Sequence, residues 1–207
     1  MRLYHVGFNV IEKPDLLRGR KNADFGQGFY LSNDLDFSNK WARESSDADS
    51  ILNHYEIDLN GLNVKEFKRD NEWFNYIFKN RNGFEDIYKD YDVIIGPIAN
   101  DTIFDTWGII TSGYVSEKRA LKALINGPEY IQIVIKTNKA LDKLKFIKSE
   151  IMDKKIINSY RDEVLKEQEE YQQIVLKVLG RKIRKMLGWA SSLFFIFILI
   201  LLIVFFI

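Results

Sequence analysis

The sequence contains no cysteine, and its 207 residues include only two histidines and three prolines. Without cysteine, neither a disulfide framework nor a thiolate metal or redox site can form. The two histidines, His5 and His54, are too few for a histidine-based zinc centre, so no metal site is expected. The absence of cysteine is also compatible with a reducing cytoplasm.

Net charge is nearly absent as well, because 30 basic residues balance 29 acidic ones and leave a charge of +1. Such a balance gives no field of one sign that would attract nucleic acid to the whole molecule. The first residues lack the long apolar region of a signal peptide. With 46% hydrophobic and 29% charged residues, the chain has the composition of a globular domain with an additional segment.

The additional segment is an apolar run over residues 189–207, interrupted only by Ser191 and Ser192. As a helix it would be about 28 Å long, close to the ~30 Å hydrocarbon thickness of a bilayer. A run this long and uniform is typical of a single transmembrane helix, whereas a buried core helix is the alternative. A basic flank precedes it, with no acidic residue inside: Lys177, Arg181, Lys182, Arg184 and Lys185. This flank predicts a C-terminal anchor with the N-terminal domain in the cytoplasm.

The chain is organised around residues 24–32, in which Gly26 and Gly28 lead into a short aromatic strand. Glycines allow a positive φ and close backbone approach, so we expect Tyr30 to be presented to a pocket. His5 lies in a short β-type run near the N-terminus, and we expect it to face the same pocket. The alternative is an ordinary bulge with both residues in the core.

The pattern elsewhere predicts a mixed α+β domain. Strands are expected at 2–6, 28–32, 51–59, 62–67, 91–95, 129–137 and 144–147, with helices at 34–43, 71–80, 101–110 and 116–125 and a short one from Asn138. Asn60 and Gly61 predict a hairpin between the third and fourth strands. His54 lies on this hairpin and is expected at the surface or an edge rather than as a ligand.

Residues 149–179 are charged and contain no proline or glycine, which predicts a long stalk helix. An apolar stripe with a single break at Glu167 runs along it: Ile157, Tyr160, Val164, Tyr171, Ile174 and Val178. The helix either packs on the domain or pairs with a second copy. The predicted domains are therefore 1–148 (globular), 149–188 (stalk with a basic end) and 189–207 (transmembrane).

An ordered set of short segments resembles the ADP-ribosyltransferase superfamily, more narrowly its small bacterial toxin-like branch, long described only as a domain of unknown function. The segments are Leu3-Tyr4-His5, Gly19-Arg20-Lys21-Asn22, residues 24–30, Trp73 with Asn80-Arg81, Tyr91-Asp92, Gly96-Pro97, Ala99-Asn100-Asp101, Gln132 to Thr137, and Lys139-Ala140-Leu141. The resemblance implies a split β-sheet fold that binds NAD, as a substrate, in a cleft between two small sheets.

The resemblance also implies roles for individual residues. His5 would bond the nicotinamide-side ribose and Tyr30 would stack on the nicotinamide. The backbone beside His5 would hold the carboxamide, so the NAD-binding set is His5, Val6, Gly7, Gly28, Phe29 and Tyr30. Here Val6 stands where the family usually has glycine directly after the histidine.

The resemblance implies a third catalytic role for a polar residue at the start of a late strand, which here is either Gln132 or Glu129. Three residues apart on a strand, they point to opposite faces, so at most one can serve the site. We favour Gln132, which leaves this position without a carboxylate.

The expected function is a membrane-anchored, cytoplasm-facing ADP-ribosyltransferase, a glycosyltransferase of the pentosyl type, that acts on an unidentified acceptor in a toxin or defence role. The alternative is a membrane-tethered nucleotide-binding module with weak or no activity. Expected partners besides NAD and the acceptor are the membrane through 189–207, an antitoxin or immunity protein, and a second copy through the stalk.

Overall fold

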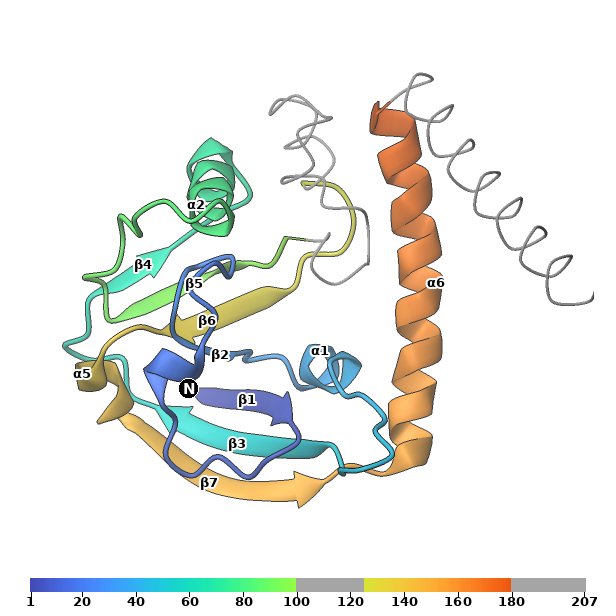
Figure 1. The fold of residues 1–207 in the computed structure, drawn as a ribbon, viewed down its shortest axis with the longest axis horizontal. Helices are drawn as coiled ribbons and strands as arrows, with labels where there is room; N and C mark the ends of the chain where they lie inside the picture. Colours follow the sequence, from blue (N-terminus) through green and yellow to red (C-terminus); the bar gives the residue numbers. More distant parts are fainter. Residues whose placement is uncertain (100–124, 180–207) are drawn as a thin grey trace, which may run out of the picture.

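The strands form two sheets in a mixed α+β arrangement (Figure 1), in a computed structural model that describes residues 1–99 and 125–179. The first sheet is antiparallel, in the order β1 (Arg2–Gly7), β3 (Ile51–Ile57), β7 (Leu144–Ile151). The second has the order β2 (Phe29–Leu31), β6 (Ile131–Ile135), β5 (Val93–Pro97), β4 (Val64–Glu66). The described helices are α1 (Leu35–Lys40), α2 (Asn71–Arg81), α5 (Asn138–Leu141) and α6 (Lys154–Leu179), with a 3-10 turn at Leu16–Arg18.

The two sheets meet where β1 passes the end of β2. Tyr4 and Ser32 exchange two backbone hydrogen bonds there, with N···O distances of 2.8 and 3.0 Å. Apolar side chains of both sheets fill the space beside this junction, including Leu3, Phe29 and Ile133. The apolar character of β5 and β6 is thus explained by their burial between layers.

The strands expected from the sequence are confirmed as elements, but the hairpin after β3 is wrong. Gly61 does form a turn, with φ +74°, yet β4 joins the other sheet and pairs in parallel with β5. Asp92, just before β5, accepts a hydrogen bond from the backbone N–H of Asn63 at 2.8 Å. This hydrogen bond holds the segment after the turn beside the start of β5. The turn therefore connects β3 of the first sheet to β4 of the second.

Helix α6 packs on the domain through part of its predicted apolar stripe, because Ile157 and Tyr171 are buried. Tyr171 joins one core cluster with Trp73 of α2 and with Val175, a residue that the stripe did not include. Glu167, which interrupts the stripe, also contacts the domain, because its Oε1 lies 2.5 Å from Lys40 Nζ of α1. The helix begins at Lys154, and residues 149–151, assigned to the stalk from sequence, belong to β7.

Several sequence expectations fall on residues outside the described ranges. These are the helices at 101–110 and 116–125, apart from Ile125 in a turn, and the apolar run at 189–207. In residues 1–99 and 125–179, no helix is long and apolar enough to span a bilayer.

Asp92 joins three segments of the second sheet. Besides Asn63, its carboxylate accepts hydrogen bonds from Thr137 Oγ1 at 2.6 Å and from Lys139 Nζ at 2.8 Å. The backbone bond from Asn63, followed by those from Lys139 and Thr137, lowers the pKa of Asp92 to about 2. The ionised form is therefore favoured by folding.

We predict that Asp92→Asn lowers the free energy of unfolding at pH 7 by about 1–2 kcal/mol. Because the folded pKa is depressed, this stability is present above the unfolded value near 3.8 and is lost as the pH falls toward 2. Denaturant unfolding between pH 2 and 7 measures it, with the exposed Asp90→Asn as the matched control. Equal acid dependence in Asp92→Asn and the parent chain would contradict the assignment.

Candidate functional site

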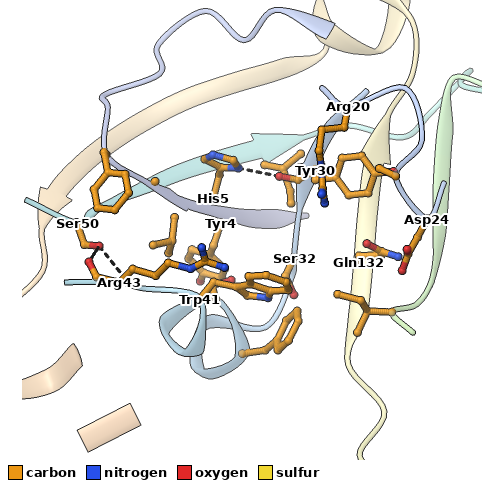
Figure 2. Close-up of a pocket in the computed structure, with 18 residues that line it drawn as sticks. Tyr4, His5, Arg20, Asp24, Tyr30, Ser32, Trp41, Arg43, Ser50 and Gln132 are labelled. Atoms are coloured by element: carbon orange, nitrogen blue, oxygen red, sulfur yellow. Dashed lines mark hydrogen bonds between the residues drawn. The ribbon is translucent and has the colours of Figure 1, made fainter. Parts of the chain in front are cut away.

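A cavity of about 410 Å³ opens at the junction of the two sheets, beside α1 (Figure 2). Strand β1 supplies one wall, the loop before β2 and the start of β6 a second, and α1 with the segment after it a third. The polar and aromatic side chains of interest that line it are His5, Arg20, Asp24, Tyr30, Trp41, Arg43 and Gln132. The cavity thus gathers residues from five separate parts of the chain.

His5 projects from β1 with its ring against Phe29, the ring centroids being 4.8 Å apart. Its Nδ1 lies 2.8 Å from the backbone oxygen of Tyr30. A carbonyl oxygen can only accept, so Nδ1 carries the proton and Nε2 of the neutral ring is an acceptor. Burial lowers the pKa of His5, against the opposing effect of the Tyr30 carbonyl, so the ring is neutral at pH 7. Nε2 lies over Gly7 and is available to a ligand hydroxyl.

Tyr30 is fixed by its hydroxyl rather than by burial of the whole ring. The hydroxyl donates to the Gly26 backbone oxygen at 2.7 Å and accepts from the Phe25 N–H at 3.0 Å. Burial, followed by the charge of Asp24, raises the pKa of Tyr30. The ring is only partly buried and forms part of the cavity surface, so it is restrained and presented at once.

The two candidates for the third role lie in different places. Gln132, on β6, is 5% exposed and lines the cavity with His5 and Tyr30. Its Nε2 is buried and has no hydrogen-bond partner within the part of the chain that the structure describes. Glu129 precedes β6, is exposed, and has its Oε2 3.9 Å from Arg69 Nε outside the cavity. The structure therefore brings Gln132, not Glu129, together with His5 and Tyr30.

Of the remaining residues predicted to bind NAD, two line the cavity and two do not. Val6 and Gly7 line the cavity, whereas Gly28 and Phe29 do not. A Cβ at Gly28 would lie 2.5 Å from the backbone oxygen of Ile135, so this glycine permits close packing of β2 on β6. Phe29 is buried in the core beneath His5.

Other cavity residues were not assigned a role from sequence. Arg20 and Asp24 belong to the segments that carry the resemblance, so the motif contained a signal for them. Arg43 and Trp41 follow a short helix and carry no motif, and only the packing of α1 against β1 brings them to the cavity. Within residues 1–99 and 125–179, neither Arg20 nor Arg43 forms an ion pair.

His54 lies away from this cavity, on β3, where its Nε2 is 2.8 Å from Glu150 Oε1. Among the described residues, no group of three or more histidine, aspartate or glutamate side chains is arranged to hold a metal ion.

Comparison with known proteins places the chain in a family. No curated protein and no solved structure matches the chain. Residues 1–146 match a family described as "Protein of unknown function (DUF3990)". Because this match includes β1, β2 and β6, the strands that carry His5, Tyr30 and Gln132, it contains the core of the cavity. The chain belongs to this family of unknown function.

Proposed function

We propose that the chain binds NAD in this cavity and transfers its ADP-ribose to an acceptor, as an ADP-ribosyltransferase with the split-sheet fold of that superfamily. The observation that carries the proposal is Gln132, which lines the cavity and whose buried Nε2 has no hydrogen-bond partner among the residues that the structure describes. An unsatisfied buried donor costs about 1–3 kcal/mol, so a ligand that offers an acceptor oxygen is favoured. A ribose hydroxyl supplies such an oxygen.

The nicotinamide half of NAD fits the neighbouring groups. The restrained Tyr30 ring offers a flat apolar face on which the nicotinamide can stack. His5 Nε2 can accept a hydrogen bond from a ribose hydroxyl, and Gln132 can donate one to the same ribose. Val6 and Gly7 line the cavity, and their backbone would hold the carboxamide.

The charge of the cavity also suits a dinucleotide. Arg20 and Arg43 are cationic and have no ionic partner in the described parts of the chain, whereas Asp24 is paired with Arg81 at 2.7 Å. The two arginines therefore leave an excess of positive charge on the cavity lining. The diphosphate of NAD carries two negative charges and would supply them.

The chemistry begins with cleavage of the bond between ribose C1′ and the nicotinamide nitrogen. The bonding electrons pass to the nitrogen, which becomes neutral, and positive charge develops on the ribose ring. Tyr30 and His5 would hold the ring and the ribose in fixed orientation, which lowers the barrier by pre-organisation. The acceptor oxygen or nitrogen then bonds to C1′ and releases its proton to water.

A catalytically weak nucleotide-binding module is the second candidate. It is favoured by one observation, that Gln132 is neutral and cannot serve as a general base. Both candidates share the anchor that we propose for 189–207, with the domain on the cytoplasmic side, in a toxin-like or defence role. They differ only in whether bound NAD is consumed.

His5→Ala and Tyr30→Ala in the full chain are each expected to weaken NAD binding about tenfold or more, or 1.4 kcal/mol. Calorimetry measures the affinity, and nicotinamide release measures turnover. His54→Ala, the other histidine, is the matched control and should bind as the parent does. Because the pKa of His5 is lowered, binding should be constant near pH 7 and weaken only below the ordinary value of 6.5, as Nε2 gains a proton. Unchanged binding in both cavity variants would refute the site.

Gln132→Ala is expected to weaken NAD binding by about fivefold to a hundredfold, because the ligand loses one hydrogen-bond donor inside a buried site. Glu129→Ala is the matched control, three residues away and outside the cavity, and should leave the affinity unchanged. Weaker NAD binding by Glu129→Ala together with unchanged binding by Gln132→Ala would assign the third role to Glu129. Tight binding by the parent without nicotinamide release would favour the binding module.

Deletion of 189–207 is expected to move the protein from the membrane fraction to the supernatant of lysed cells. The loss of the apolar run removes the hydrophobic free energy of insertion while the basic flank remains. Fractionation followed by a carbonate wash measures the distribution, with the full chain as the reference. Protein that stays with the membrane after the deletion would show that another part of the chain attaches it.

A further inference from the structure

Asp24 is the only carboxylate on the cavity lining among the residues that the structure describes. It lies in the loop before β2 and is 6% exposed. Arg81 Nε binds its Oδ1 at 2.7 Å, and the Ala99 backbone N–H approaches Oδ2 at 3.3 Å. Asn80 Nδ2 also donates to the Asp24 backbone oxygen at 3.0 Å, so both the side chain and the backbone of Asp24 are fixed.

The ion pair is oriented with its negative end toward the cavity. Asp24 lines the cavity, whereas Arg81 does not, so the guanidinium lies behind the carboxylate as seen from a ligand. Charges in a partly desolvated site interact more strongly than charges in water. A ligand therefore meets fixed negative charge here, although Asp24 is balanced within the protein.

Asp24 stands at the same end of the cavity as Tyr30 and Gln132 (Figure 2). The Tyr30 hydroxyl turns back onto Phe25 and Gly26, the two residues that follow Asp24. The Asp24 charge is near enough to raise the pKa of Tyr30, after the larger effect of burial. A nicotinamide stacked on Tyr30 would place its ribose beside both Asp24 and Gln132.

We infer that Asp24 supplies the negative charge that stabilises the ribose cation, a role that the neutral amide of Gln132 cannot fill. This inference rests on the proposed reaction of NAD. When the C1′–N bond breaks, its electron pair leaves with neutral nicotinamide and the positive charge on C1′ and the ring oxygen faces the carboxylate. The acceptor atom then forms the new bond to C1′ and loses its proton to water, while Asp24 remains ionised throughout. Gln132 thus binds the ribose, and Asp24 opposes the positive charge that develops on it.

The test is Asp24→Asn in the full chain, because asparagine keeps the size of the side chain and one oxygen for Arg81 but removes the charge. Nicotinamide release should fall about a hundredfold or more, as for other groups that stabilise transition-state charge. The Kd for NAD should change less than about threefold, because the ground-state contacts remain. Thermal unfolding of both proteins checks that the fold is intact.

Asn80→Ala is the matched control for the loop, since it removes an anchor of Asp24 without changing its charge. If Asp24 only anchors the loop, the two variants will lower turnover equally, and this overturns the inference. Turnover equal to the parent's, or loss of NAD binding by a folded Asp24→Asn, overturns it as well. If Asp24→Asn does not fold, nicotinamide release is measured for Asp24→Glu, which keeps the charge. Release by this variant supports the role of the charge, whereas a folded variant that releases no nicotinamide overturns it.

Failure of the inference is distinguishable from failure of the proposed function. A parent chain that binds NAD without releasing nicotinamide overturns the role of Asp24 and leaves the binding module. A parent chain that binds no NAD overturns the proposed function itself.

Discussion

The pairing of Tyr4 with Ser32 is the contact on which the cavity depends. Its two backbone hydrogen bonds, at 2.8 and 3.0 Å, join two sheets that share no strand within residues 1–99 and 125–179. His5 follows Tyr4 and Tyr30 comes two residues before Ser32, so the same contact brings these side chains to one place. The 2.8 Å bond from His5 to the Tyr30 carbonyl then fixes the ring of His5. A β-bridge of a single residue pair thus sets the geometry of the proposed nicotinamide site.

The loop before β2 forms a second layer of restraint. Gly26 adopts φ +71°, and a Cβ there would lie 2.5 Å from Asp86 Oδ2, so no other residue fits without displacement. Lys136 Nζ binds both the Phe25 backbone oxygen and Asp86 at 2.7 Å. Tyr30 is held against this rigid loop before any ligand arrives. Pre-organisation of this kind reduces the entropy that a ligand must lose on binding.

Local patterns in the sequence predict the strands and the helices α1 and α2, because each depends on residues close in the chain. Short motifs also single out His5 and Tyr30, but their meeting across 25 positions depends on the bridge between β1 and the end of β2. The parallel pairing of β4 with β5 was not predictable in this way, since it depends on Asp92 reaching Asn63 across 29 positions. Glu167 was interpreted as a break in a stripe, but its partner Lys40 is 127 residues distant. Arg43 likewise reaches the cavity only through the packing of α1. Long-range contacts decide these points, and spacing alone does not encode them.

Helix α6, which lies beyond the segment that defines the family, supports the site from outside the cavity. Phe37 and Trp41 line the cavity from α1 and the residue after it, while Lys40 of the same helix binds Glu167 of α6. Tyr130 connects the two sides, because its ring stacks on Phe37 at 4.4 Å and its hydroxyl donates to Glu167 at 2.7 Å. The family match ends at residue 146, before α6 begins. One wall of the cavity is therefore supported by the helix that leads toward the proposed membrane anchor, so a protein cut at the end of the family match would lack part of what holds its site together.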